Sequence, residues 1–151
     1  WNMTDIQASI GLVELCRYEA DMLPRRKYIF KKYDEAFKKY SWAKLPISLT
    51  NNKESSYHVY PLRITGIDEL TRDNIISNIF EMNVSVNVHF IPLPMMSFYR
   101  NMGYDINEYP VAYKNYSQEI SLPVYYDLKD EDIEVVINAV VMSVSKILNY
   151  D

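Results

Sequence analysis

Polar and apolar residues alternate most regularly over residues 84–90, VSVNVHF. A period of two places the three valines and Phe90 on one face of a predicted strand, and the other face carries Ser85, Asn87 and His89. Pro92 and Pro94 follow, and they end the strand because proline has no N–H to donate to a neighbouring strand. The pattern therefore predicts a strand that holds small polar groups and an imidazole beside a rigid exit.

The polar face of this segment has two interpretations. Either it is a row of ligand-facing groups with His89 at the rim, or it is the water-facing side of a half-buried strand. The alternation alone is compatible with both.

Helical spacing accounts for three longer stretches and one shorter one. Thr4 and Gln7 form a capping box ahead of a predicted helix at 5–21, and Pro24 suits the start of a second stretch that runs to about residue 40. A third helix opens at Thr71 or Asp73 and ends near residue 83, and a strongly amphipathic helix is predicted over 130–148. The predicted inward residues are Ile6, Ile10, Val13, Ile29, Phe30, Tyr33, Phe37, Tyr40, Ile75, Ile76, Ile79, Phe80, Ile133, Val136, Ile137, Val140, Val141, Val144 and Leu148.

Two further strands and two short helices complete the order. Residues 57–64 alternate as a strand whose Pro61 indicates an edge or a bulge, and residues 120–124 form a short strand. Short helices are predicted at 95–100 and 110–119, the latter with Val111 and Tyr116 inward, and 41–56 is a polar loop. Helices interleaved with a few short strands predict an α+β fold, in which helices cover a small sheet.

Two single residues carry specific expectations. Gly11 lies in the middle of the first helix, where glycine costs about 1 kcal/mol relative to alanine, so we expect another element to approach closely there. His58 shares a strand face with Leu62 and Ile64, which favours a hydrogen-bonded histidine in the core.

Composition and charge narrow the classes of function. The chain has 151 residues, a net charge of −4 and one cysteine, Cys16. The negative charge argues against general affinity for nucleic acid or acidic membranes, and one cysteine excludes an internal disulfide. We expect a soluble, cytoplasmic protein, and because the chain starts at Trp1 directly before a helix, we expect it to be the later part of something longer.

Complete catalytic motifs are absent from the sequence. It contains no glycine-rich phosphate loop, no nucleophile elbow and no spacing typical of a metal site, and its only histidines are His58 and His89. The acidic run at 130–132 is explained by the start of a helix. The residues by themselves predict a domain that contributes to a site completed elsewhere, with no catalytic residue and no metal ligand of its own.

Four motifs in order resemble those of one enzyme family. MTDIQASIGLVEL at 3–15, SSYHVYPLRI at 55–64, NVSVNVHFIPLP at 83–94 and SLPVYYDLKDEDIEVVINAV at 121–140 are similar to segments of the DegT/DnrJ/StrS nucleotide-sugar aminotransferases. The resemblance implies the C-terminal domain of a fold-type I transferase that depends on pyridoxal phosphate (PLP). Residues 1–40 would be a helical link from a preceding large domain, and residues 41–151 would be the small domain.

The resemblance also implies an activity, partners and site residues. The family transfers an amino group from glutamate or glutamine to a ketosugar attached to a nucleotide, on PLP bound to a lysine and an aspartate. Both of those residues would lie outside this chain, which alone would be inactive. His89 matches a family histidine near the substrate, and Asn87 shares its face, so both are predicted to bind substrate. The family's dimeric sites imply a homodimer, with the helix after Thr4 near the interface.

Departures from the family pattern limit these assignments. An asparagine before the MTDIQ motif reaches the partner's PLP phosphate in the family, but Asn2 stands at a different position of that motif, so it is only a weak candidate for cofactor binding. A second family histidine is replaced here by Pro94. The alternative to an enzyme is a regulatory or binding domain without catalytic activity that keeps the same fold.

Overall fold

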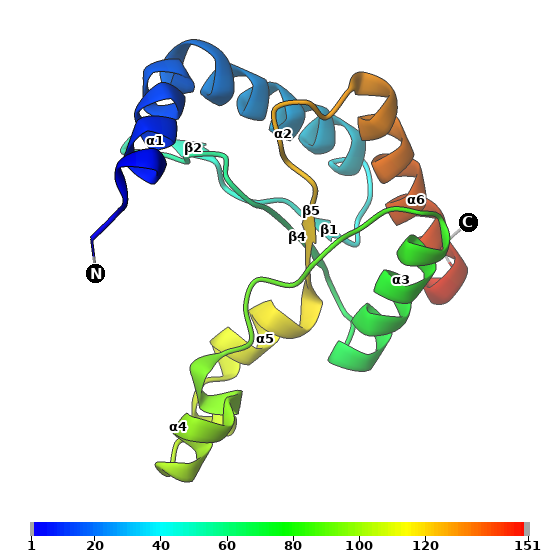
Figure 1. Cartoon of the computed structure of the whole chain (residues 1–151). Coiled ribbons are helices and arrows are strands. Elements are labelled where there is room, and N and C mark those ends of the chain that lie inside the picture. The colour runs from blue at the N-terminus through cyan, green and yellow to red at the C-terminus, as the bar shows by residue number, and fades with distance from the viewer. Residues whose placement is uncertain (1, 150–151) are drawn as a thin grey trace.

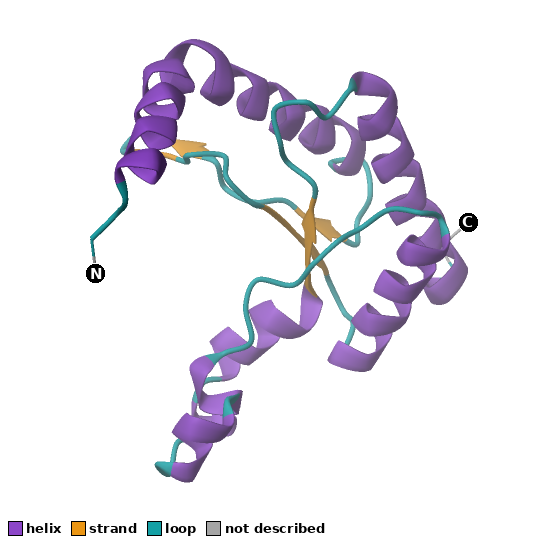
Figure 2. Cartoon of the chain, viewed as in Figure 1, coloured by secondary structure: helices purple, strands orange, loops and turns teal. Residues whose placement is uncertain are grey.

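A three-stranded antiparallel sheet lies at the centre of the computed structural model, which describes residues 2–149. Its strands are β1 (Ala43–Lys44), β4 (Tyr60–Ile64) and β5 (Glu119–Leu122), in the order β1-β4-β5. A separate hairpin pairs β2 (Leu49–Thr50) with β3 (Lys53–Glu54). The prediction of a small sheet among helices is confirmed (Figure 1, Figure 2).

Helices make up most of the remaining chain. They are α1 (Asp5–Arg17), a π-helical turn (Tyr18–Met22), α2 (Leu23–Phe37), α3 (Glu69–Glu81), α4 (Ser97–Asn101), α5 (Pro110–Gln118) and α6 (Asp130–Leu148), with 3-10 turns at Leu93–Met95 and Ile106–Glu108. The capping box at Thr4 and the bounds of α6 agree with the sequence analysis. α3 begins earlier than predicted, because the Asp68 side chain accepts the Thr71 N–H and caps the helix.

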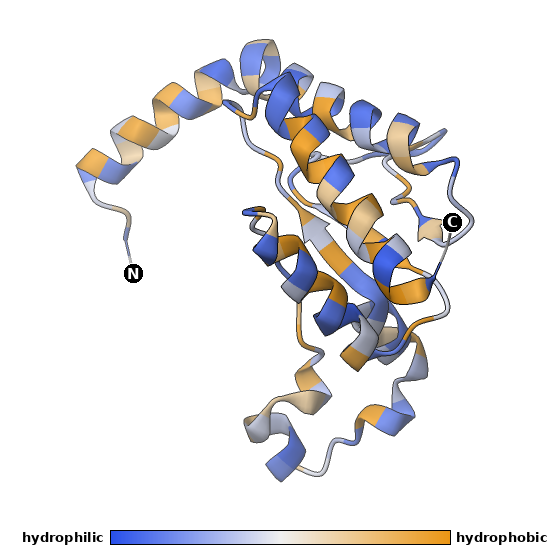
Figure 3. Cartoon of the chain, turned by 90° about the vertical axis from the view of Figure 1, so that its right-hand side faces the viewer, coloured by the Kyte–Doolittle hydropathy of each residue, from blue (hydrophilic) through white to orange (hydrophobic). Residues whose placement is uncertain are grey.

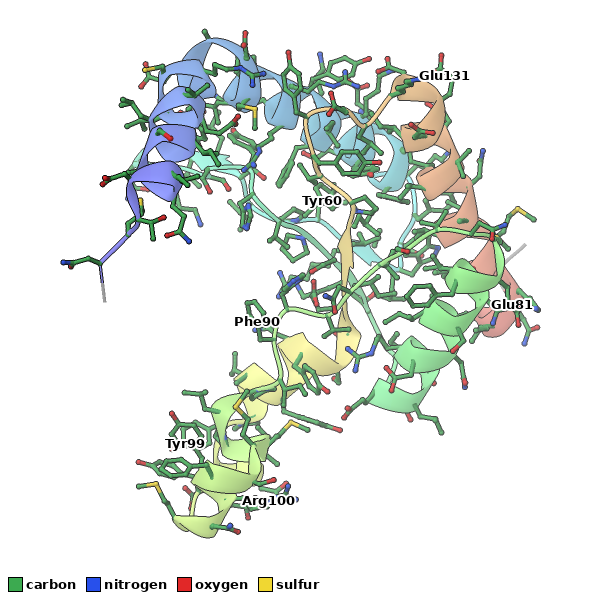
Figure 4. The ribbon with its side chains drawn as sticks, viewed as in Figure 1. Tyr60, Glu81, Phe90, Tyr99, Arg100 and Glu131 are labelled. Carbon is green, nitrogen blue, oxygen red and sulfur yellow. The ribbon has the colours of Figure 1, made fainter. Side chains whose placement is uncertain are left out.

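The hydrophobic core lies on one face of the sheet. Tyr60, Leu62 and Ile64 point to this face from β4, and β5 adds Ile120 and Leu122. Helices α2, α3 and α6 cover it with aromatic and branched side chains, among them Ile29, Phe30, Tyr33, Phe37, Ile75, Ile79, Ile133, Val136 and Val140. Figure 4 shows Tyr60 below α2, inside this layer. Packing of this face therefore fixes the position of β4 and β5.

Polar contacts reinforce the same layer. The Tyr60 hydroxyl donates to Asp34 Oδ1 at 2.7 Å, and the Tyr33 hydroxyl donates to the Pro123 carbonyl at 2.9 Å. Burial raises the pKa of Tyr60, and Asp34 beside it acts in the same direction, so the hydroxyl keeps its proton. The bonds join α2 to β4 and to the exit of β5, so the aromatic layer is fixed in register as well as buried.

Proline is tolerated in β4 because a short neighbour leaves one side open. The prediction of an edge or a bulge at Pro61 is wrong, since β4 lies between β1 and β5 and its register with β5 is unbroken from Tyr60 to Arg63. However, β1 pairs only with Arg63 and Ile64, so Pro61 lies beyond the end of β1. The N–H that proline lacks therefore costs no bond to β1.

Residues 84–90 do not form the regular strand that their alternation predicts. They make one antiparallel bridge, between Asn87 and Ser121. Val84 and Val86 are buried as expected, but Phe90 is 76% exposed, at the point where the segment leaves the sheet toward α4 (Figure 4). The predicted apolar face therefore holds only for the first half of the segment, because the second half runs out over a region without a covering helix.

Several single-residue expectations are also wrong. His58 is exposed, since β4 begins only at Tyr60 and His58 therefore lies outside the ladder that would have turned it inward. Phe80 and Val111 are exposed as well, because no described element packs over those faces of α3 and α5. The predicted polar loop at 41–56 contains the short strands β1, β2 and β3.

Helix α1 buries none of its residues within the chain. Its predicted inward residues Ile6, Ile10 and Val13 are all exposed, and a Cβ built on Gly11 meets no atom within 4 Å. Figure 3 shows apolar positions along this helix, which projects away from the rest of the molecule. The close approach expected at Gly11 is therefore not made by the described part of this chain. Across residues 2–149, no helix is both long and apolar enough to cross a membrane.

Candidate functional site

The face of the sheet opposite the core carries polar residues. Strand alternation places Pro61 and Arg63 of β4 on this face, and across the β4–β5 ladder they pair with Ser121 and Glu119, respectively. None of the three covering helices lies on this side, so we call it the open face. The same two-residue period that fills the core therefore places polar side chains on the reverse face, where Glu119 and Ser121 are themselves buried.

The segment after α3 covers one edge of the open face. The Asn87 N–H donates to the Ser121 carbonyl at 3.2 Å, and the Ser121 N–H donates to the Asn87 carbonyl at 2.7 Å. This pair of bonds fixes the register of residues 84–90 against β5. Two residues further on, the backbone brings His89 over the side chains of β5.

Three side chains form a connected hydrogen-bond network at this point. His89 Nδ1 lies 2.8 Å from Ser121 Oγ, and the Ser121 hydroxyl donates to Glu119 Oε1. The His89 backbone N–H donates to Glu119 Oε2 at 3.0 Å. Both carboxylate oxygens of Glu119 therefore accept hydrogen bonds. One bond comes directly from the His89 backbone, and the other comes from Ser121, which contacts the His89 ring.

Burial and hydrogen bonding act on Glu119 in opposite directions. Burial raises the pKa of this carboxyl above its usual value, while the hydroxyl of Ser121 and the N–H of His89 lower it. Burial has the larger effect, since only 5% of the residue is exposed. The two donors hold the buried carboxylate in place, and the carboxylate in turn restrains the Ser121 side chain and the His89 backbone.

Arg72 fixes the backbone that carries Glu119. Its guanidinium donates to the Tyr116 carbonyl at 2.9 Å and to the Glu119 carbonyl at 3.3 Å, and it lies over the Tyr116 ring. Arg72 itself is buried, with Asp73 as its closest anion at 2.6 Å. Helix α3 thus holds the junction of α5 and β5 with charge-assisted bonds, which are about twice as strong as neutral ones.

Two hollows meet at His89. The first, of about 360 Å³, lies on the open face and is lined by Pro46, Pro61, Arg63, His89, Phe90, Pro92, Ala112, Asn115, Tyr116 and Glu119. The second, of about 380 Å³, is lined by His58, Val59, Ser85, Val86, Asn87, His89, Ser121, Leu122, Pro123 and Val124. His89 is common to both linings, and each hollow combines apolar residues with a few polar ones.

The structure brings together two of the three predicted site residues. His89 and Asn87 line the same hollow, although the carbonyl oxygen of the Asn87 side chain already accepts the Val88 N–H at 2.8 Å. Asn2 precedes α1 and lines neither hollow. A role for any of the three in binding stays a prediction.

Sequence analysis did not identify Glu119, Ser121 or Arg63 as site residues. The signal was present in β5, where Glu119 and Ser121 alternate with Ile120 and Leu122. Only the pairing with Asn87 shows that these polar residues face His89. Arg63 was missed for the same reason, because the strand at 57–64 was interpreted from its apolar positions.

Neither hollow has a lysine among its lining residues, so the described chain offers no amine there for a Schiff base. Over residues 2–149 the structure also groups no three His, Cys, Asp or Glu side chains in a way suited to a metal ion. The arrangement offers the side chains of His89, Arg63 and Asn87 as polar contacts for a ligand.

Comparisons with known proteins place this chain in one family. The DegT/DnrJ/EryC1/StrS aminotransferase family model matches residues 1–141. The uncharacterized protein MJ1066 of Methanocaldococcus jannaschii is 40% identical over 149 residues, which cover 97% of this chain and 38% of that protein. The spore coat polysaccharide biosynthesis protein SpsC of Bacillus subtilis is 34% identical over 145 residues, 92% of this chain and 36% of its own length.

Solved structures agree with this assignment. The apo form of a putative sugar aminotransferase, Spr1654 from Streptococcus pneumoniae, has a TM-score of 0.93 and 38% identity, and the match covers 98% of this chain and 37% of that one. Its PLP form gives a TM-score of 0.91 at the same identity, covering 97% of this chain and 37% of that one. The chain spans between one third and two fifths of the length of these relatives. It belongs to the DegT/DnrJ/EryC1/StrS aminotransferase family.

Proposed function

We propose that this chain is the C-terminal, substrate-facing part of a PLP-dependent sugar aminotransferase. The whole enzyme would transfer an amino group from glutamate or glutamine to a nucleotide-linked ketosugar, in amino-sugar or cell-surface polysaccharide biosynthesis. The observation that carries the proposal is the position of His89, which lies next to the bridge between Asn87 and Ser121 and lines both hollows. Family membership supplies the reaction class.

The chemistry of the first hollow suits a nucleotide sugar. Arg63 donates to Asn115 from its Nη1, and both side chains line the hollow with polar groups. Phe90 and Pro92 offer apolar surface for a sugar or base face, and His89 offers a ring nitrogen for a hydroxyl. A site with a few polar groups on an apolar wall orients a ligand, which is the task that we assign to this part of the enzyme.

The remaining parts of the active site would come from outside this chain. The Schiff-base lysine and the aspartate that holds the pyridine nitrogen would belong to a preceding large domain, with residues 1–40 as the link and 41–151 as the small domain. The match of this chain to only 37% of the solved Spr1654 chain supports this division. PLP, when bound in the whole enzyme, supplies the electron sink for amino transfer.

Borohydride trapping tests this division of labour. The 151-residue chain incubated with PLP should give no stoichiometric adduct on a single lysine after reduction, whereas the longer protein that carries it should. A specific adduct on the chain alone would contradict the proposal. A longer protein that also fails to form one would instead be a binding or regulatory protein without catalytic activity.

Steady-state kinetics test the role of His89. In the longer protein, His89→Asn should raise KM for the sugar substrate more than it lowers kcat, a loss on the order of 1–3 kcal/mol because a hydrogen bond to the ligand is removed. Glu81→Gln is the control, since Glu81 is exposed and lines neither hollow. An unchanged KM, or loss of bound PLP, would contradict this role.

We also propose that the longer protein is a homodimer, with the exposed apolar residues of α1 near its interface. Gly11 has no neighbour within 4 Å of an added Cβ, so a larger side chain there clashes with nothing in the described chain. We therefore expect Gly11→Leu to leave the fold intact and to weaken dimerisation in sedimentation experiments. An unchanged dimer would place α1 away from the interface.

A further inference from the structure

We propose that Glu119 is a positioning residue that fixes the tautomer of His89 through Ser121. In this arrangement the neutral ring carries its proton on Nδ1 and presents Nε2 as a hydrogen-bond acceptor. The geometry behind the proposal is the chain of contacts from Glu119 Oε1 to the Ser121 hydroxyl and from Ser121 Oγ to His89 Nδ1. The choice of ligand group below rests on the proposed function, but the tautomer itself does not.

The positions of the protons follow from which groups can donate. An ionised carboxylate only accepts hydrogen bonds, so the single proton of the Ser121 hydroxyl goes to Glu119. Ser121 Oγ then turns a lone pair to His89 Nδ1, 2.8 Å away. Nδ1 must therefore be the protonated nitrogen of the neutral ring. Because the serine hydroxyl has one proton, donating it to the carboxylate leaves the serine oxygen as an acceptor for the imidazole.

A backbone donor prevents the carboxylate from turning away. The His89 N–H donates to Glu119 Oε2 at 3.0 Å, and a backbone N–H cannot exchange its role with an acceptor. Arg72 holds the Glu119 carbonyl from the other side at 3.3 Å. The side chain and the main chain of Glu119 are thus fixed independently. The direction in which the hydrogen bonds of the network run therefore depends on this one carboxylate.

The fixed tautomer selects the kind of group that His89 binds. Nε2 makes no hydrogen bond within residues 2–149, and His89 is a lining residue of both hollows. As an acceptor, neutral His89 recognises a donor such as a sugar hydroxyl, and it does not favour a diphosphate oxygen, which also only accepts. His89 would therefore read the sugar part of the nucleotide sugar.

The substitution Glu119→Gln should reverse the network. The oxygen of the introduced amide must face the His89 N–H, because that backbone group is an obligatory donor, so the amide NH₂ faces Ser121. Ser121 Oγ then accepts from this NH₂ group and gives its own proton to His89 Nδ1. The proton of the ring moves to Nε2. A merely structural role for Glu119 predicts no such exchange between the two nitrogens.

Long-range ¹H–¹⁵N correlation NMR on the 151-residue chain measures the tautomer directly, at a pH high enough for both histidines to be neutral. A His58→Gln background leaves only the signals of His89. We expect the protonated-nitrogen shift on Nδ1 in this background and on Nε2 in Glu119→Gln. Glu81→Gln, a change at an exposed glutamate of α3, is the matched control and should keep the Nδ1 pattern.

Two results, obtained with Glu119 intact and with Glu119→Gln, would overturn the proposal. One is a ring protonated on Nε2 with Glu119 intact, and the other is a folded Glu119→Gln chain with an unchanged Nδ1 pattern. If Glu119→Gln lacks the dispersed amide spectrum of a folded chain, Ser121→Ala decides: it should give the averaged pattern of a free imidazole, and a retained Nδ1 pattern contradicts the relay. Because no ligand is present, failure of this test is separate from failure of the proposed function.

Discussion

The two faces of β4 show how neighbouring residues in one strand acquire different tasks. Leu62 is fully buried beneath three helices, while Arg63, the next residue, lies on the open face and donates to Asn115. Tyr60 and Pro61 divide in the same way. The covered face excludes water and fixes the strand, so that the open face can hold polar groups at positions that the strand defines.

The same contrast separates the two long terminal helices. Helix α6 packs against α3 and α2 and buries a full stripe of residues, whereas α1 buries none of its residues. Both are amphipathic in sequence, but only α6 has a partner within the described chain. An apolar stripe predicts that a helix packs somewhere, and it does not say in which molecule or domain.

The largest expected effect is at the covered face. Leu62→Ala should lower the free energy of unfolding by about 2–5 kcal/mol, because it removes a fully buried side chain and leaves a cavity. Arg63→Ala, one position along the same strand, should cost less than about 1 kcal/mol. Urea unfolding of the chain measures both. Equal losses would mean that the open face also carries the fold.

Tyr60→Phe should have a smaller effect on the same face. It keeps the ring in the core but removes the hydroxyl that donates to Asp34, at a cost of about 1–2 kcal/mol. Burial raises the pKa of Asp34, and the bond from Tyr60 opposes this rise, so the variant should raise that pKa further. Urea unfolding together with NMR titration of the Asp34 carboxyl checks both effects. An unchanged carboxyl pKa would contradict the bond.

A comparison of pH profiles tests the open face. Burial raises the pKa of Glu119 above its usual 4.5, so between that value and its folded pKa the native state binds more protons than the unfolded state. The free energy of unfolding should therefore fall as the pH rises through this window, relative to Glu119→Gln. The lowered pKa values of Glu54, Asp68 and Asp130 act oppositely in both proteins and cancel in the difference. A difference that is flat or rises with pH would contradict the burial.

The smallest expected effect is at α1. Ile10→Ala should change the free energy of unfolding of the chain by less than about 0.5 kcal/mol, because 61% of Ile10 is already exposed. Ile133→Ala in α6 provides the contrast, since that side chain is buried. Thermal or urea unfolding of the two variants side by side is sufficient. A large loss from Ile10→Ala would mean that α1 packs within the chain after all.

Most of the fold was predictable because local patterns determine it. The capping box at Thr4, the stripe of α6 and the order of elements follow from residues close together in sequence. The errors arise where tertiary context decides. His58 lies before the start of β4, and Phe90 lies where the chain leaves the sheet. The two-residue period assigned both to a buried strand face, but the strand does not extend to either residue.

The candidate site was predictable only in part, for the same reason. His89 and Asn87 stand out within one segment, because their alternation with valines is local. Glu119 and Ser121 lie about 30 residues further along, and only the Asn87–Ser121 bridge brings them to His89. The register of a long-range pairing depends on the whole core, so no local pattern could have joined the two halves.

A crystal structure of the longer protein with its nucleotide sugar bound tests the central claim most directly. The account predicts the ligand against the open face, with a sugar hydroxyl within hydrogen-bond distance of His89 Nε2 and Phe90 and Pro92 beside it. A ligand that binds away from both hollows, with His89 facing only water, would contradict the account and leave the polar face of residues 84–90 as solvated surface.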